Sequence, residues 1–130
     1  MKSENSLRTP LAKVRGLGSA RSGTQHFWRQ RMTAVANVPL AIAFVWIIAS
    51  LAGADQATVI RAVAHPLTGI LLLLFLISGI IHMRLGMQSI IEDYVTEEIP
   101  KLLMLMLNSF FAAAAGLACV WAILKISFGM

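Results

Sequence analysis

Residues 66–91 read PLTGILLLLFLISGIIHMRLGMQSII, an apolar run whose first charged side chain is Arg84. At 1.5 Å of rise per residue, a helix of this length crosses the ~30 Å hydrocarbon core of a bilayer. Pro66 suits the first turn of such a helix, where a missing N–H leaves no partner unpaired. The run therefore predicts a membrane-spanning helix.

Two further uncharged runs, residues 32–53 and 102–124, are also long enough to span a bilayer. Inside the first run, Pro39 predicts a kink, and Asn37 is expected to face another helix rather than lipid. The short polar connection 54–64 favours an interfacial half-helix. Together the runs predict an all-α membrane protein with three transmembrane helices.

The composition of the 130 residues excludes several other classes of protein. Hydrophobic residues make up 58% of the chain and charged residues 13%, whereas a soluble domain has roughly a quarter of its residues charged. The mean hydropathy of +0.75 excludes disorder over most of the chain. One cysteine, Cys119, cannot form the disulfide framework of a secreted domain.

Seven of the eleven basic residues lie in the first 31 positions, where Glu4 is the only acid. In a membrane protein this bias places the N-terminus in the cytoplasm, so three crossings place the C-terminus in the periplasm. The same clustering in a tail argues against nucleic-acid binding as the reason for the net charge of +5. The acidic loop 92–101 then falls on the cytoplasmic side, where acidic residues weigh little in the topology.

We expect residues 1–23 to form a basic flexible tail and residues 24–130 to form the transmembrane domain. The glycines at positions 16, 18 and 23 make a persistent helix unfavourable before about residue 24. Trp28 beside Arg29 predicts an anchor at the membrane interface. The tail lacks the apolar core of a secretory signal, and its Arg-rich composition leaves a mitochondrial transit peptide as the alternative to a retained tail. We favour the bacterial inner membrane over the mitochondrial one.

His82 is the only deep histidine, and a stripe of small and polar residues accompanies it. On a helical projection, members of this stripe lie within about 60° of His82; they are Ser78, Gly79, Gly86, Ser89 and Asp93. One interpretation is helix packing through small residues, with the imidazole hydrogen-bonded across the contact. The other is a haem site with His82 as axial ligand, in which case another subunit supplies any second histidine.

Asp93 and Tyr94 follow His82 by about 16.5 Å if the helix continues, which places them at the cytoplasmic interface. A phenol there can donate a hydrogen bond to a quinone carbonyl, and Asp93 can orient it or relay a proton. The alternatives are an interfacial aromatic residue and a solvated carboxylate at a helix end. The sequence leaves both alternatives open.

The string HMRLGMQSIIEDY, residues 82–94, resembles the signature of the hydrophobic membrane anchor subunit of succinate dehydrogenase, respiratory complex II. The shared pattern is a histidine, a glycine four residues later, and Asp-Tyr at the eleventh and twelfth following positions. Residues 22–34, SGTQHFWRQRMTA, are similar to the start of the first helix in the same family. His26 lies one place from the family's histidine, and neither His26 nor Arg84 receives a role.

The resemblance implies a succinate:quinone oxidoreductase in which this chain packs with a second three-helix anchor, the cytochrome b subunit. Haem b would lie between the two anchors, with His82 as axial ligand to its iron and Arg31 near its propionates. Tyr94 and Asp93 would belong to the ubiquinone site. Electrons from succinate would arrive through a flavoprotein subunit with FAD and an iron–sulfur subunit.

The chain itself is not expected to oxidise succinate, because one cysteine cannot hold an iron–sulfur cluster and no flavin fingerprint is present. The main alternative is a haem-free structural or assembly subunit of another membrane complex. A proton-coupled multidrug transporter is disfavoured because no Asp or Glu lies inside a span. A di-haem cytochrome would need about four deep histidines.

Overall fold

The computed structural model describes residues 9–15 and 22–129. All regular structure in these ranges is helical, and three of the helices are long and apolar enough to cross a membrane, α2, α4 and α5. The helices are α1 (Pro10–Val14), α2 (Ser22–Ser50), α3 (Gln56–Ala64), α4 (Pro66–Tyr94) and α5 (Glu98–Ser127). The prediction of an all-α, three-span membrane protein is confirmed.

The connection between α4 and α5 is shorter than predicted. Helix α4 begins at Pro66, as expected, but runs on to Tyr94 instead of ending at residue 91. Helix α5 begins at Glu98 instead of residue 102, since an acidic first turn suits the helix dipole and Pro100 is tolerated there. The predicted acidic loop 92–101 therefore shrinks to residues 95–97, and Asp93 lies within the last turn of α4.

The boundaries of the first span also differ from the prediction. Helix α2 ends at Ser50 rather than residue 53, and the chain turns through Gly53 in the left-handed region at φ 80°. Helix α2 starts at Ser22, and the short α1 forms where only a flexible tail was expected, with Pro10 in its favourable first turn. The rest of the predicted tail, residues 1–8 and 16–21, lies outside the described residues.

The half-helix predicted between the first two spans is present as α3. Arg61 donates a hydrogen bond to the Thr58 hydroxyl at 3.1 Å on its exposed surface. His65 separates α3 from α4 with extended backbone angles, because the residue before Pro66 is disfavoured in helical conformation. Ser127 of α5 donates to the Val63 carbonyl at 3.5 Å, which joins α3 to the end of the last helix.

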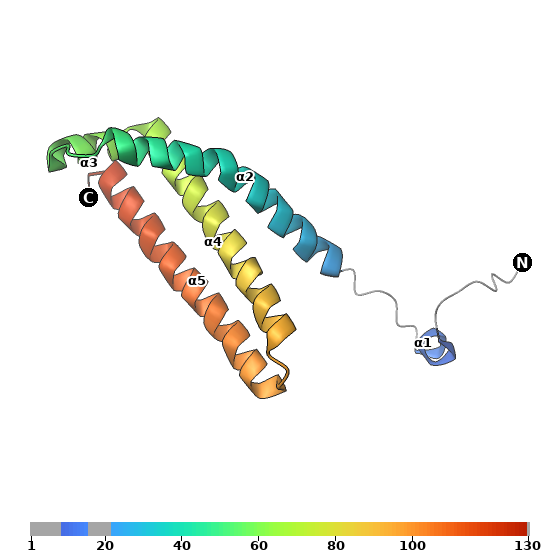
Figure 1. Cartoon of the computed structure of the whole chain (residues 1–130). Coiled ribbons are helices and arrows are strands. Elements are labelled where there is room, and N and C mark those ends of the chain that lie inside the picture. Colours follow the sequence, from blue (N-terminus) through green and yellow to red (C-terminus); the bar gives the residue numbers. More distant parts are fainter. Residues whose placement is uncertain (1–8, 16–21, 130) are drawn as a thin grey trace, which may run out of the picture.

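Helix α4 is the central element of the fold. Helix α2 packs against one side of α4 and α5 against the other, and within the described residues no Cα atom of α2 comes within 8 Å of one of α5. Figure 1 shows α5 running alongside α4, whereas α2 bends and diverges from them. The start of α2, the end of α4 and the start of α5 lie at one end of this layer, called here the Tyr94 end. The opposite end, where α3 packs against α4 and α5, is called the α3 end.

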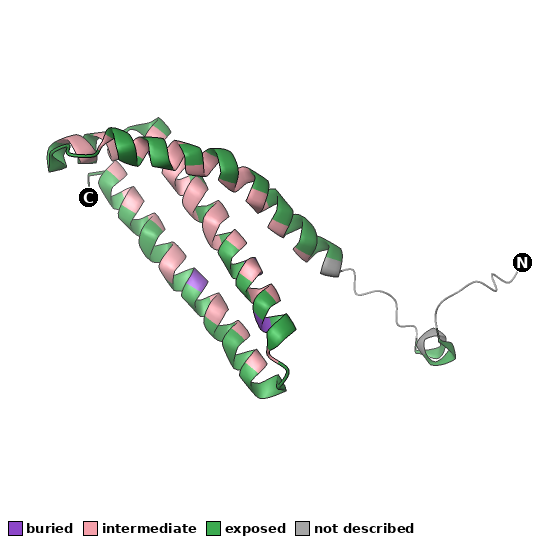
Figure 2. Cartoon of the chain, viewed as in Figure 1, coloured by how far each residue is buried: buried purple, intermediate pink, exposed green. Residues whose placement is uncertain are grey.

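Most apolar side chains of the described residues are exposed (Figure 2). The buried hydrophobic residues there are only Leu85, Ile91 and Ala112. A soluble monomer rarely exposes apolar surface on this scale. The layer of helices therefore requires lipid or other protein chains to cover it.

Two polar contacts and one glycine bring α5 against α4. Asn108 Nδ2 donates to the Arg84 carbonyl at 2.9 Å, which gives this amide a partner inside the span. Lys101 Nζ donates to the Glu92 carbonyl at 3.1 Å at the Tyr94 end. A Cβ atom on Gly116 would lie 3.1 Å from Ile80 Cδ1, so a larger residue here would require the Ile80 side chain to shift.

Candidate functional site

His82 lies on the face of α4 that packs against α2. Its Nδ1 is 3.1 Å from Thr33 Oγ1, and Thr33 Oγ1 is also 2.8 Å from the Arg29 carbonyl oxygen and 3.1 Å from that of Gln30. A hydroxyl carries one proton, so Thr33 donates to the backbone carbonyls and accepts from His82 Nδ1–H. This assignment from the hydrogen-bond network leaves the Nε2 lone pair of a neutral His82 unused.

The small-residue stripe of α4 packs against α2 over most of its length. Ser78 Oγ lies 3.5 Å from the Thr33 carbonyl, and a Cβ on Gly86 would lie 3.2 Å from Gln30 Nε2. Gly79 differs, because no atom lies within 4 Å of the position its Cβ would take. The packing interpretation therefore describes Ser78 and Gly86, whereas open space remains beside Gly79, one turn from His82.

A polar stripe on α2 faces α4, and of its members the sequence singled out Asn37 as a helix-facing residue and His26 as a histidine without a role. Its members, His26, Gln30, Thr33 and Asn37, are separated by four, three and four residues, which is the spacing of one helix face. Three of their atoms are buried without a hydrogen-bond partner: His26 Nε2, Gln30 Oε1 and Asn37 Oδ1. Each buried polar atom without a partner costs about 1–3 kcal/mol of stability. The three unpaired atoms therefore indicate that water or another group reaches the contact between α2 and α4, called here the α2–α4 seam.

Arg31 lies beside the seam and not in it. Its guanidinium carbon is 4.6 Å from the centroid of the Phe27 ring, a cation–π contact. Arg31 also lines an open cavity of about 480 Å³ together with His26, Gln30 and Ser89. No hydrogen bond joins Arg31 to His82 in the described structure.

Asp93 and Tyr94 are exposed at the end of α4, and Tyr94 is 82% exposed. One side-chain hydrogen bond lies on the last turns of α4, where Gln88 Nε2 donates to Glu92 Oε1 at 2.7 Å. The described residues provide neither Asp93 nor Tyr94 with a side-chain hydrogen bond. The four predicted site residues are thus spread along the molecule, with His82 in the α2–α4 seam and the Asp93–Tyr94 pair about 16.5 Å further along the helix.

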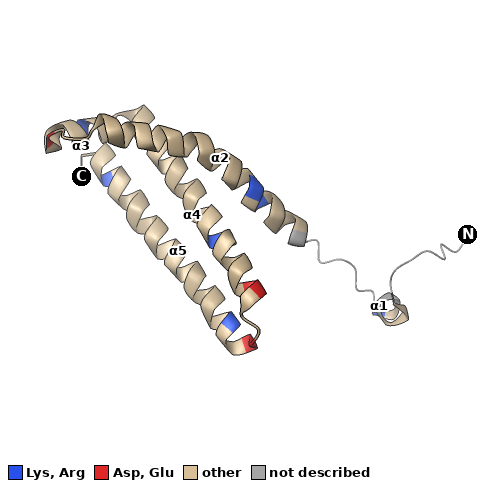
Figure 3. Ribbon diagram, viewed as in Figure 1, with Lys and Arg blue, Asp and Glu red and all other residues tan. Residues whose placement is uncertain are grey.

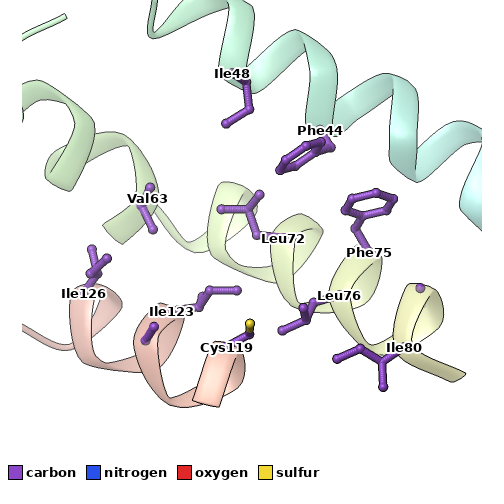
Figure 4. A pocket seen from close by; sticks show the side chains of 12 residues that line it. Phe44, Ile48, Val63, Leu72, Phe75, Leu76, Ile80, Cys119, Ile123 and Ile126 are labelled. Atoms are coloured by element: carbon purple, nitrogen blue, oxygen red, sulfur yellow. The ribbon is translucent and has the colours of Figure 1, made fainter. Parts of the chain in front are cut away.

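An apolar cavity of about 520 Å³ lies toward the α3 end, among α2, α3, α4 and α5. Phe44 and Phe75 stack across it with ring centroids 4.9 Å apart, and Cys119 faces it from α5 (Figure 4). Gly79 lines the same cavity, which accounts for the open space beside that residue. No acid, base or imidazole lines this cavity, so it offers shape and apolar surface but no acid–base chemistry.

Comparison with known proteins settles the family. Residues 5–124 match the model of the succinate dehydrogenase/fumarate reductase transmembrane subunit. The chain belongs to this family. The predicted family is thereby confirmed, and with three spanning helices the chain is a multi-pass membrane protein.

Three bacterial proteins are similar to this chain. The chain is 31% identical to the succinate dehydrogenase hydrophobic membrane anchor subunit of Paracoccus denitrificans, over 93% of each chain. It is 33% identical to the subunit of the same name from Rickettsia bellii, over 68% of this chain and 71% of that one. The corresponding identity to the Rickettsia conorii subunit is 29%. No solved structure gives a significant match.

Proposed function

We propose that this chain is the hydrophobic membrane anchor subunit of a succinate:quinone oxidoreductase, that it holds haem b together with a second anchor, and that it forms part of the ubiquinone reduction site. Family membership supports the anchor role. The observation that carries the haem assignment is the hydrogen bond between Thr33 and His82. The alternative is a haem-free structural subunit, in which the same bond only joins two helices.

The donor set around His82 fits a haem. A histidine that binds a metal through one ring nitrogen almost always donates its other N–H to an acceptor, which fixes the tautomer. Thr33 provides that acceptor on Nδ1, and Nε2 is left for iron. When bound, haem b would supply a one-electron redox centre whose potential depends on both axial ligands.

The second axial ligand would come from the partner anchor, the cytochrome b subunit. Among the described histidines, His82 is the one away from the ends of the spanning helices, since His26 lies in the first turns of α2 at the Tyr94 end and His65 lies between α3 and α4 at the α3 end. An open layer of three helices also leaves the flanks of the seam exposed. Arg31, on one of these flanks, would pair with a haem propionate, because guanidinium groups bind carboxylates with two parallel hydrogen bonds.

The Tyr94 end would face the bacterial cytoplasm. The basic residues at the N-terminal end of the chain, including Arg29 and Arg31 near the start of α2, favour this orientation, with the C-terminus in the periplasm. The iron–sulfur and flavoprotein subunits would dock on this face and deliver electrons from succinate, since this chain has only Cys119 for cluster ligation. The bacterial origin of the relatives agrees with an inner-membrane location.

Tyr94 and Asp93 would serve the quinone at that interface. The exposed phenol can donate to a quinone carbonyl and hold the head group near the end of α4. Reduction of a quinone takes up two protons, and the adjacent carboxylate of Asp93 can orient the phenol or pass a proton from the cytoplasm. Neither side chain is engaged within the described chain, so both remain available to a ligand.

The test is the succinate–quinone reductase activity and the reduced-minus-oxidised spectrum of the assembly that co-purifies with this chain in mild detergent. We expect inhibitor-sensitive activity together with a haem b spectrum. An active assembly without haem would support the anchor role and refute the function assigned to His82. An intact assembly without the activity would refute the proposed function as a whole.

A further inference from the structure

A second polar cavity, separate from the Arg31 flank, lies between α2, α4 and α5 and has a volume of about 540 Å³. Two arginines from different helices line it, Arg29 of α2 and Arg84 of α4. Two hydroxyl residues, Thr33 and Ser109, add polar groups, and no acidic residue lines the cavity. The remaining lining is apolar and consists of Ile80, Ile81, Leu85, Ala112 and Ala113.

Arg84 is unusual because of its depth in the span. It lies about 15 Å along α4 from Tyr94, and its carbonyl is bonded to Asn108 within the span of α5. Figure 3 shows a basic band partway along α4, whereas the acidic bands of α4 and α5 lie at the Tyr94 end. An arginine at this depth is costly unless it finds a counter-charge or reaches toward the interface.

We propose that this cavity binds one anionic phospholipid of the leaflet at the Tyr94 end. The phosphodiester would lie between the Arg29 and Arg84 guanidinium groups, which bind phosphate oxygens with two parallel hydrogen bonds. An acyl chain would follow the apolar floor, where Ala112 and Ala113 leave space on α5. Two cations above an apolar floor match a charged head group joined to a hydrocarbon chain, and this combination disfavours both free phosphate and an uncharged quinone.

The site is distinct from the flank assigned to the haem propionates. Arg29 and Arg31 are two residues apart and so point about 200° apart around α2. Each lines its own cavity, and the cavity that holds Arg29 includes neither Arg31 nor His82. The proposal therefore stands whether or not haem is bound at His82.

The test uses the whole assembly that co-purifies with this chain, stripped of lipid in mild detergent. It is titrated with phosphatidylglycerol or with phosphatidylcholine of the same acyl chains, and retained lipid is counted by native mass spectrometry. We expect one phosphatidylglycerol per copy of this chain, retained in preference to phosphatidylcholine. The double variant Arg29→Gln/Arg84→Gln is expected to bind about thirtyfold more weakly, which corresponds to about 2 kcal/mol.

Two control variants separate charge from fold. Arg61→Gln removes an arginine from the exposed surface of α3 and should leave phosphatidylglycerol binding unchanged. Arg29→Lys/Arg84→Lys keeps both charges and should recover most of the loss. If the glutamine variant does not assemble, Ala113→Leu provides the same test, because it fills the groove and leaves both arginines in place; its binding should also weaken.

Several results would overturn the proposal. Equal retention of the two lipids by the wild-type assembly would show that the cavity does not select charge. Unchanged binding in both the double glutamine variant and Ala113→Leu would place the lipid elsewhere. Displacement by inorganic phosphate that Ala113→Leu does not affect would identify a free-phosphate site. A carboxylate of another subunit seated between Arg29 and Arg84 would identify a protein contact instead.

Discussion

Replacing Thr33 with valine removes the hydroxyl that accepts a hydrogen bond from His82 Nδ1–H and keeps the shape of the side chain. The N–H would then be half-buried in the α2–α4 seam without a partner, at a cost of about 1–3 kcal/mol. At 1.4 kcal/mol per factor of ten, this range corresponds to roughly fivefold to a hundredfold. The loss agrees with the roughly 10–100-fold reduction in metal affinity seen when such outer partners are removed.

The assay is the haem b content of the purified assembly after dilution in detergent, together with the midpoint potential of the haem. We expect Thr33→Val to lose haem on dilution. The remaining haem should have a more positive potential, because an imidazole without its hydrogen-bond acceptor is a weaker donor to ferric iron. A tenfold difference between the two oxidation states corresponds to about 59 mV for one electron.

Two further variants make this result specific to the hydroxyl. Thr33→Ser keeps the oxygen and should retain both haem content and potential. Thr68→Val makes the same exchange near the start of α4, away from His82, and should resemble the wild type. If Thr33→Val also matched the wild type in both measurements, Thr33 would not be the outer partner of a haem ligand, and the tautomer argument would fail.

Three other substitutions test the haem ligand, the quinone site and the packing of α5 on α4. His82→Ala should lower the haem b content of the assembly about tenfold or more while the other subunits still co-purify; an unchanged spectrum would exclude His82 as a ligand. Tyr94→Phe should lower quinone reduction about tenfold and leave succinate oxidation by a soluble dye intact, and equal quinone turnover would remove Tyr94 from the quinone site. Gly116→Val should lower the thermal stability of the assembly by about 1–3 kcal/mol, because its side chain meets Ile80. Ala118→Val, at an exposed position of α5, is the matched control. Equal melting temperatures of the Gly116→Val and Ala118→Val assemblies would contradict the close approach of α4 and α5.

The helical architecture was predictable because the bilayer sets a length that apolar runs must match. Pro66 marked the start of α4 correctly, and the connection after the first span formed the expected half-helix. The errors lie at the other helix ends. Glu98 and Pro100 were assigned to a loop, yet both residues are favourable in the first turn of a helix. No persistent helix was expected before about residue 24, but the five-residue α1 forms from Pro10.

The candidate site was only partly accessible from sequence. His82, Asp93 and Tyr94 stand out because imidazoles, charges and phenols are rare near or inside a span. Thr33 does not stand out, since threonine is common in membrane helices and its partner is 49 positions away. The regular spacing of His26, Gln30 and Asn37 was visible, but nothing in the sequence states that α4 covers that face.

The sequence by itself determined the number of spans, their approximate limits and the family, because hydrocarbon thickness and a local motif are both read along one chain. Only the tertiary structure decided which side chains meet. In a membrane helix the faces toward lipid and toward protein are both apolar, so hydropathy does not indicate which neighbour a face contacts. Packing alone joins Thr33 to His82 and forms the cavities that Arg29 and Arg31 line.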